Sequence, residues 1–327
     1  MADFKLRSLC PADLDRVSDI ESQIAGSPRR PFFEKRLALA TAQPESFITC
    51  GAEQGGKLLG FAFARIQEGD FGKPGTLAVL DNLNVDPDAQ GKGVGKAVMS
   101  GIEHRVKTKQ ISTLKTEVDW TNRAMTGFFS AAGFRLAASQ IIERDTSPLR
   151  EEVAEVATIR MDSRWQVHSS AGGNDYDRLN RDRVLVRSFK QEDLAAIVRI
   201  DGKLTGQERS AYYTAKSREV LDESGIRVSV VSEDDGIVTG FIMARVDFGE
   251  FGKLDAQAVI DTIGVHPAYK GSGIGHALLS QLLLNLSTLK VESVRTQVSW
   301  ENSDLHRFLH DCGFSPSQRL ILTKSAS

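Results

Sequence analysis

Two glycine-rich stretches are the strongest chemical signal in the sequence. The first reads QGKGVG over residues 90–95, and the second reads KGSGIG over residues 270–275. Each follows a strand-like apolar segment and precedes a segment with the pattern of an amphipathic helix. The first N–H groups of a helix have no intrahelical partner, and glycine lets a bulky anion approach them. The pattern therefore predicts two sites for a pyrophosphate-like anion, with Lys92 adding a positive charge in the first.

Two other phosphate-binding loops do not match this spacing. A Walker A loop needs four residues between its first glycine and Gly-Lys, followed by Ser or Thr. Here three residues separate Gly91 from Gly95, Ala97 follows Lys96, and His276 replaces the lysine in the second stretch. A Rossmann fingerprint opens its fold with G-x-G-x-x-G, whereas these stretches read G-x-G-x-G and lie in the middle of their domains.

The two stretches belong to two copies of one longer unit. A shift of 180 positions aligns the two ends of the chain without a gap. The matching pairs include Arg7 and Arg187, Gly60 and Gly240, Asp81 and Asp261, Trp120 and Trp300, and Phe134 and Phe314. A period this long indicates a domain duplication and not a solenoid. We predict domains at 1–147 and 181–327, joined by a linker at 148–180.

Each copy has the same predicted order of elements. In the first copy we expect strands at 4–9, 45–50, 57–66, 76–85 and 112–118, one or two strands within 134–145, and helices at 11–23, 31–41, 93–108 and 121–132. Helices interspersed among partly antiparallel strands predict an α/β fold with a mixed sheet in each domain.

Composition limits the class of protein. The 327 residues favour two domains, and an apolar fraction of 41% with 26% charged residues is typical of a globular chain. A net charge of −2 gives no electrostatic basis for binding nucleic acid or an anionic membrane. Three scattered cysteines suit a reducing compartment, and the N-terminus lacks the pattern of a secretory signal. We therefore expect a cytoplasmic protein that acts on a small molecule or a specific protein site.

The first stretch resembles the Q/R-x-x-G-x-G/A signature of the GNAT superfamily of N-acetyltransferases. The order of elements around it is also similar to that family. In the second copy Lys270 replaces Gln or Arg, while the glycines stay. The family's later motif is an Asn on the fourth helix with Gly-Phe eleven and twelve residues on. Asn122 with residues 133–134 and Asn302 with residues 313–314 match it, so the resemblance implies two tandem GNAT-like domains.

The resemblance implies a cofactor, acetyl-CoA or another acyl-CoA. The strand before each loop would bond the pantetheine arm through its backbone, the loop would hold the diphosphate, and the Asn would lie near the thiol. The implied cofactor-binding residues of the first domain are Leu83, Asn84, Val85, Gln90, Gly91, Lys92, Gly93, Val94, Gly95, Lys96 and Asn122. Those of the second domain are Ile263, Gly264, Val265, Lys270, Gly271, Ser272, Gly273, Ile274, Gly275 and Asn302.

The implied reaction is direct acyl transfer to an amine, which needs a proton acceptor at neutral pH. The candidate acceptors are Asp81 and its match Asp261. Strand alternation predicts that Asp81 shares a face with Val79, Leu83 and Val85, and apolar neighbours would raise its pKa. The alternative is that Asp81 caps a loop or pairs with an arginine.

One expected residue is missing from both copies. Many family members carry a Tyr seven residues after the Asn, as general acid for the leaving thiolate, and this chain has Phe129 and Leu309 there. Two hypotheses stay open. The first is an N-acyltransferase acting on a small-molecule amine or a protein lysine, with the first domain the better active candidate. The second is an acyl-CoA-binding sensor or scaffold without catalysis. No metal site is expected, and the oligomeric state is open.

Overall fold

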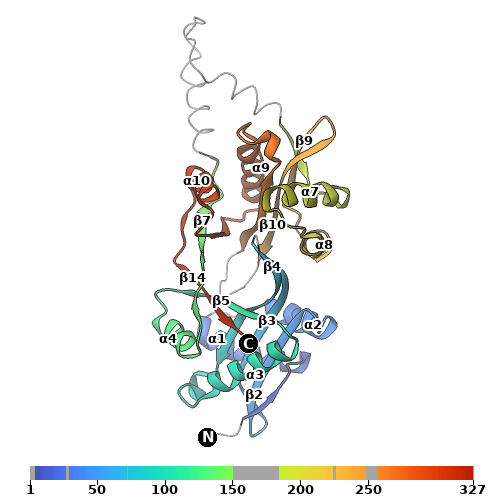
Figure 1. The fold of residues 1–327 in the computed structure, drawn as a ribbon. Coiled ribbons are helices and arrows are strands. Elements are labelled where there is room, and N and C mark those ends of the chain that lie inside the picture. The colour runs from blue at the N-terminus through green and yellow to red at the C-terminus, as the bar shows by residue number, and fades with distance from the viewer. Residues whose placement is uncertain are drawn as a thin grey trace, which may run out of the picture. The chain divides into compact units, whose positions relative to one another are not determined.

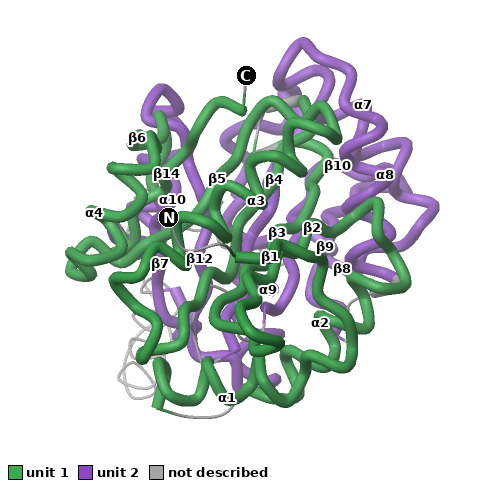
Figure 2. The backbone as a smooth tube through the Cα atoms, turned by 90° about the horizontal axis from the view of Figure 1, so that it is seen from below, with its two compact units in different colours: residues 1–140, 248–255, 317–327 green, residues 141–247, 256–316 purple. Residues whose placement is uncertain are grey.

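The computed structural model contains two compact units. It describes residues 4–26, 29–71, 73–149, 184–223, 226–247 and 256–326. The N-terminal unit comprises residues 1–140, 248–255 and 317–327, and the C-terminal unit comprises residues 141–247 and 256–316 (Figure 2). The predicted linker, apart from residues 148 and 149, lies outside the described residues. No described helix is long and apolar enough to cross a membrane.

The N-terminal unit is built on a seven-stranded sheet with the order β1-β2-β3-β4-β5-β14-β6 (Figure 1). Its strands are β1 (Lys5–Arg7), β2 (Phe47–Gln54), β3 (Lys57–Asp70), β4 (Lys73–Val85), β5 (Thr113–Asp119), β6 (Arg135–Leu136) and β14 (Arg319–Ser325). Its helices are α1 (Leu14–Ala25), α2 (Arg30–Ala42), α3 (Val94–Thr108) and α4 (Arg123–Ala131), with short 3-10 turns at Pro11–Asp13 and Pro87–Ala89. The β4–β5 pair is parallel, and the other pairs are antiparallel.

The C-terminal unit repeats this plan in a second sheet with the order β13-β7-β12-β11-β10-β9-β8. Its strands are β7 (Ser139–Asp145), β8 (Leu185–Ser188), β9 (Val230–Asp234), β10 (Ile237–Asp247), β11 (Gln257–Val265), β12 (Ser293–Ser299) and β13 (Ser315–Pro316). Its helices are α7 (Leu194–Thr205), α8 (Ser210–Arg218), α9 (Ile274–Thr288) and α10 (Ser303–Asp311), and a π-helical turn follows α8 at Glu219–Glu223. The predicted α/β fold with a mixed sheet is confirmed for both units.

Side-chain alternation explains how helices cover both faces of the N-terminal sheet. On β3, Ala62 and Ala64 belong to a core shared with α3, whereas Phe61 and Phe63 belong to a core shared with α1 and α2. The small alanines let α3 lie close to the sheet, and the large phenylalanines fill the space below α1 and α2. We call the α1/α2 side of the sheet the acceptor face and the other side the α3 face.

The last strand of each sequence repeat lies in the sheet of the other unit. The 180-residue shift places β14 on β7, yet β14 pairs with β5 from Arg319↔Asp119 to Ser325↔Thr113, and β7 lies between β12 and β13. Buried pairs of similar shape, Ile141-Ile142 and Ile321-Leu322, suit either sheet. The sequence repeat therefore describes the duplication, while the compact units differ from the repeats by one exchanged strand.

This exchange predicts which strand weakens when a buried side chain of β14 is shortened. Ile321 stands opposite Glu117 of β5 and is 1% exposed. We expect Ile321→Ala to destabilise the N-terminal unit by about 2–5 kcal/mol, because it leaves a cavity against β5. Faster hydrogen exchange at the amides of residues 113–119 measures the effect.

Ile141→Ala is the matched control, since Ile141 holds the same repeat position in β7 and is 3% exposed. It should speed exchange in β12, at residues 293–299, and leave β5 unchanged. Faster exchange of β12 rather than β5 in Ile321→Ala would show that the strands are not exchanged.

Candidate functional site

An extra residue interrupts β4 where it pairs with β3. Phe63 stands opposite Asn82, but the next residue, Ala64, stands opposite Leu80. Asp81 therefore has no opposite residue and forms a β-bulge. A bulge bends its strand and changes the direction of the side chains that follow.

The C-terminal unit has the same bulge at the matching residue. Met243 stands opposite Thr262 and Ala244 opposite Ile260, so that Asp261 is the extra residue. The irregularity therefore belongs to the duplicated plan and not to one unit.

The bulge corrects one sequence prediction. Asp81 was expected to share a face with Val79, Leu83 and Val85. Leu83 and Val85 pack on the α3 face, whereas the Asp81 carboxylate contacts Arg36 of α2 on the acceptor face. The expectation fails for Leu83 and Val85 because simple alternation does not continue through a bulge.

The parallel pairing of β4 with β5 stops at the bulge. Leu77–Leu80 of β4 pair with Thr113–Thr116 of β5, and both strands then continue without further mutual pairing among the described residues. At the last pair, the buried hydroxyl of Thr116 donates to the carbonyl of Leu80 at 2.8 Å. From residue 81 to residue 85, β4 keeps β3 as its only paired strand in the described sheet.

The C-terminal sheet opens in the same way. Gln257–Ile260 of β11 pair with Ser293–Thr296 of β12, and the hydroxyl of Thr296 donates to the carbonyl of Ile260 at 2.9 Å. Each described sheet therefore has two parallel strands whose mutual pairing ends at a threonine.

The predicted glycine loop follows directly from the separated end of β4. Gly91 and Gly93 have φ values of 75° and 88°, and Gly271 and Gly273 have values of 84° and 80°. This left-handed conformation favours glycine over other residues. Gly93 is the N-cap of α3 and supplies no capping side chain, so the first N–H groups of α3 lack the side-chain partner that usually satisfies them.

The last glycine of each loop allows two helices to approach. A side chain at Gly95 would meet the ring of Phe128 on α4 at 3.4 Å, and one at Gly275 would meet Phe308 on α10 at 3.2 Å. The structure thus brings the loop, the start of α3 and α4 together in the N-terminal unit, and their counterparts together in the C-terminal unit.

A carboxylate anchors the N-terminal loop to the strand that precedes it. The buried Asp86 side chain accepts from the Asp88 amide at 3.0 Å, contacts Arg16 of α1, and lies 3.4 Å from Lys57. Burial raises the pKa of Asp86, but the Asp88 amide and Arg16 outweigh that effect and hold the pKa below its ordinary value.

The corresponding anchor in the C-terminal unit is a histidine. His266 accepts from the Ala268 amide at 3.2 Å through Nδ1, and its Nε2 lies 2.7 Å from Nζ of Lys203. The lysines of the two loops also differ in their contacts. Lys92 donates to the carbonyl of Asp88 at 2.7 Å, whereas Lys270 reaches Asp304 of α10 at 3.1 Å.

Both predicted asparagines are helix caps. The side chain of Asn122 accepts from the Met125 amide at 3.1 Å, and that of Asn302 accepts from the Leu305 amide at 3.1 Å. Each cap fixes the start of the helix that follows the separated β5 or β12. A role near a bound thiol stays a prediction for both.

The position of the missing tyrosine is part of the core. Phe129 is 2% exposed and its ring lies 5.0 Å from that of Phe134, and Leu309 is 1% exposed. Neither side chain can donate a proton.

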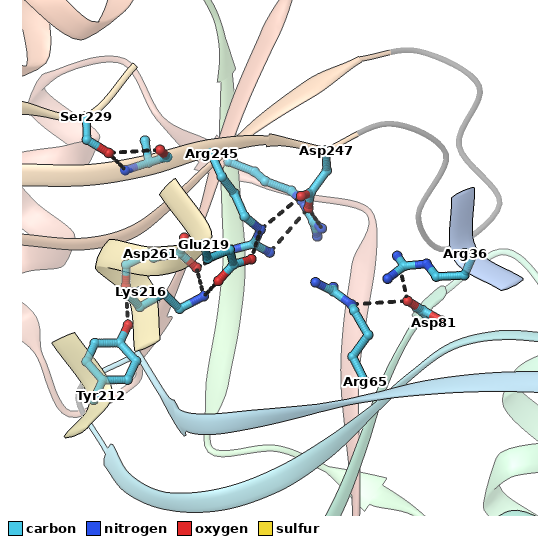
Figure 3. A network of polar contacts seen from close by, with 12 residues as sticks. Arg36, Arg65, Asp81, Tyr212, Lys216, Glu219, Ser229, Arg245, Asp247 and Asp261 are labelled. Atoms are coloured by element: carbon cyan, nitrogen blue, oxygen red, sulfur yellow. Dashed lines mark hydrogen bonds and ion pairs between the residues drawn. The ribbon is translucent and has the colours of Figure 1, made fainter. Parts of the chain in front are cut away.

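Asp81 is held by two arginines. Its Oδ2 lies 3.0 Å from Nη2 of Arg36 and 3.2 Å from Nε of Arg65, and Figure 3 marks both contacts with dashed lines (Figure 3). These contacts place two positive charges beside the carboxylate. They are the arginine pairing that the sequence left as an alternative, and a role as proton acceptor stays a prediction.

Asp261 is held in a similar way within a larger network. Lys216 lies 3.1 Å from its Oδ1, and Arg245 contacts the same oxygen (Figure 3). Glu219 pairs with Lys216 at 2.8 Å, and Asp247 pairs with Arg245 at 2.9 Å. The network joins α8, the turn that follows it, and two strands of the C-terminal unit.

Sequence reasoning missed a carboxylate beside the opening. Glu117 is the first residue of β5 beyond its pairing with β4. Leu114 and Val118 belong to the α3 core, so alternation places Glu117 on the acceptor face. The repeat offered a signal, because the two copies differ in charge at this position: Glu117 in the first copy matches Gln297 in the second.

A buried charged cluster on the acceptor face was also missed. Glu21 of α1 contacts both Arg29 and Asn84, and the guanidinium of Arg29 lies 5.3 Å from the centre of the Phe33 ring. Burial lowers the pKa of Arg29 to about 10, although the charge of Asp81 acts in the opposite direction. The cluster ties α1 and the start of α2 to the separated part of β4.

The same cluster recurs in the C-terminal unit. Arg209 donates to Asp201 at 2.8 Å through Nε, and the hydroxyl of Tyr213 donates to Asp201 at 2.8 Å. The sequence signal was the recurrence of an acidic residue and an arginine at positions 21 and 29 of the repeat.

Family models match both parts of the chain. The Acetyltransferase (GNAT) family model matches residues 14–134, and the Acetyltransferase (GNAT) domain model matches residues 224–316.

The alignments with two named relatives each span about one domain of this chain. The [ribosomal protein bS18]-alanine N-acetyltransferase of Escherichia coli (strain K12) is 27% identical over 147 residues, which span 45% of this chain and 91% of that protein. The L-methionine sulfoximine/L-methionine sulfone acetyltransferase of Salmonella typhimurium (strain LT2) is 30% identical over 122 residues, which span 37% of this chain and 66% of that protein.

Solved structures share the fold over the full length. A tandem GNAT protein from the clavulanic acid biosynthesis pathway has a TM-score of 0.62 and 15% identity, with 99% of both chains covered. A GCN5-related N-acetyltransferase from Sphaerobacter thermophilus has a TM-score of 0.60 and 13% identity, covering 99% of this chain and 96% of that one. With its two matched models and this shared fold, the chain belongs to the GNAT family of acetyltransferases and carries two GNAT domains in tandem.

Proposed function

We propose that the N-terminal unit transfers an acetyl group from acetyl-CoA to an amine acceptor. The observation that carries this proposal is the opening between β4 and β5, which leads into a glycine loop and has the carboxylate of Glu117 on its acceptor face. The C-terminal unit repeats the opening and the loop but has Gln297 in place of the carboxylate.

The residues of the opening fit an extended thioester cofactor. Acetyl-CoA would supply an acetyl group activated as a thioester. The N–H groups of residues 91–96 would bind the diphosphate, with the start of α3 contributing its positive end. The backbone of residues 83–85 would bond the pantetheine arm, because β5 no longer pairs with β4 there. Asn122 would lie near the thiol end, at the start of α4.

A carboxylate on the acceptor face can remove the proton that prevents the amine from attacking. An α-amino group has a pKa near 7.7–8.0 and a lysine amine near 10.4, so both are largely protonated at neutral pH. We propose that Glu117, directly or through a water molecule, takes a proton from the acceptor nitrogen. A C–N bond then forms at the thioester carbonyl and the C–S bond breaks. The attacking nitrogen loses its second proton to solvent, and the departing thiolate is protonated by solvent, because Phe129 cannot donate.

Asp81 has a supporting place in this scheme. Its two arginine contacts stabilise the bulge from α2 and β3, which keeps β4 apart from β5. The sequence hypothesis that Asp81 itself accepts the proton is the competing proposal, and the two carboxylates can be tested separately.

The acceptor is an amine whose identity we leave open between a protein and a small molecule. One similar protein is named for a ribosomal-protein alanine and another for methionine derivatives, which supports a panel containing both classes. We also propose a cytoplasmic location, which the three free cysteines support.

A binding-only sensor is the alternative function. It is favoured by Phe129 and Leu309, which are buried where many relatives carry the general acid. We apply it to the C-terminal unit, where a carboxylate is also replaced by Gln297. That unit would bind an acyl-CoA through residues 263–265, 270–275 and Asn302 without transferring the acyl group.

The glycine loops predict two separable binding sites. Gly93→Ala forces an L-residue into the left-handed region at a cost of about 1–2 kcal/mol. It should therefore weaken acetyl-CoA binding to the N-terminal unit by about tenfold. Gly273→Ala should do the same in the C-terminal unit. Calorimetry of the full chain should show two sites in the wild type and one weakened site in each variant.

The loop proposal is wrong if both variants bind acetyl-CoA as the wild type does. Gly26→Ala is the control, because Gly26 also has a left-handed φ of 73° but ends α1 away from either loop. It should lower stability without changing either affinity.

The two carboxylates predict different kinetic defects. Glu117→Gln should lower kcat by about 100-fold or more, since it removes a general base, and should leave the affinity for acetyl-CoA unchanged. Asp81→Asn should lower the melting temperature, because it leaves buried guanidinium groups without their carboxylate. The assay is release of free thiol from acetyl-CoA with peptides, amino acids and simple amines as acceptors.

Gln297→Glu is the matched variant in the C-terminal unit, and its gain or lack of activity reports on that unit alone. Wild-type rates in Glu117→Gln, together with a large loss in a folded Asp81→Asn, would assign the base to Asp81. Tight binding with no turnover of any acceptor by the wild type would support the sensor.

A further inference from the structure

An arginine from the far end of the chain stands beside Glu117. Arg319, the first residue of β14, is directly opposite Asp119 of β5, and Glu117 is its diagonal neighbour on the same face. Nη1 of Arg319 lies 3.9 Å from Oε2 of Glu117, with only 12% and 9% of the two side chains exposed. The exchanged strand therefore brings a positive charge next to Glu117.

The duplication provides an internal comparison for this charge. In the C-terminal unit the matching positions are Ser139 for Arg319, Ser299 for Asp119 and Gln297 for Glu117. All three charged positions of one unit are uncharged in the other, while a buried isoleucine is kept at the matching positions 141 and 321. Because the exchanged strand forms in both units, the charges are not needed for the exchange itself.

We propose that Arg319 is a positioning residue for acetyl transfer in the N-terminal unit, an inference that rests on the proposed function. Little of the Glu117 side chain reaches solvent, so a cation beside it offsets part of the cost of burying a carboxylate. Arg319 supplies that cation and holds the carboxylate on the acceptor face, but it does not touch the reacting atoms. Activity of the N-terminal unit therefore depends on a strand encoded at the C-terminal end.

Other charges also face this group. Lys115 and Asp119 lie on the same face of β5, one alternate position away on each side. Asp81, with its arginines, belongs to β4 on the far side of the opening. Replacing Arg319 leaves these residues in place, so a change in rate reports the loss of the arginine.

The test is the steady-state kinetics of the full-length protein, with an acceptor that the wild type turns over. Arg319→Gln should lower kcat by about tenfold and leave the affinity for acetyl-CoA unchanged. Arg319→Lys keeps the positive charge and should restore most of the rate.

A double variant separates support of Glu117 from a general structural effect. If Arg319 acts through Glu117, Glu117→Gln with Arg319→Gln should be no slower than Glu117→Gln alone. Ser139→Ala at the matching position of β7 is the control and should behave as the wild type does.

Three results would overturn the inference. They are an Arg319→Gln variant with the wild-type rate, additive losses in the double variant, and an Arg319→Lys variant that folds but restores nothing. If Arg319→Gln does not fold, Arg319→Lys decides alone by its kcat, which must be close to that of the wild type. Absence of turnover by the wild type itself would instead remove the proposed function, and this inference with it.

Discussion

One extra residue in β4 is the constraint on which the site depends. Asp81 interrupts the register with β3, and the parallel pairing with β5 ends one residue earlier, where Thr116 bonds the carbonyl of Leu80. Two parallel strands in register would satisfy each other's backbone groups and leave nothing for a ligand. The bulge separates them, and the same strand then runs directly into the glycine loop and α3. Arg36 and Arg65 neutralise the bulge carboxylate from the acceptor face.

The duplication lets one unit serve as the reference for the other. Features present in both units, namely the bulge, the threonine at the last pair, the left-handed glycines and the asparagine caps, describe what this fold needs to open its sheet. Features present in only one unit describe how the two openings differ. At these matched positions the carboxylate of Glu117 and the charge of Arg319 belong to the N-terminal unit, and this asymmetry supports our proposal that this unit transfers the acetyl group.

Much of this arrangement could be predicted from the sequence. The predicted helices at 93–108 and 31–41 correspond to α3 and α2, whose bounds differ by one residue at most. The glycine loop was located because backbone chemistry at a helix start requires specific residue types at fixed spacing. The repeat was visible because the two copies had kept those residues in register.

The remaining features depend on contacts between distant segments. Alternation predicted that Asp81 shares a face with Leu83 and Val85, and this was wrong. A β-bulge adds one residue to a strand and so shifts the alternation of its side chains, but the sequence of that strand alone does not reveal the extra residue. The exchange of β7 and β14 was invisible because both strands have the same buried pattern and fit either sheet. Glu117 gained its neighbour Arg319 only through that exchange, so no local pattern could have joined the two residues.

Hydrogen exchange of the full-length protein with and without acetyl-CoA tests most directly whether the opened strand and its loop hold the cofactor. We expect slower exchange at residues 83–85 and 91–96 when acetyl-CoA is present, with β1 and β2 unchanged as an internal reference. Unchanged exchange across those two segments at saturating acetyl-CoA would contradict a cofactor site built on the bulge of β4.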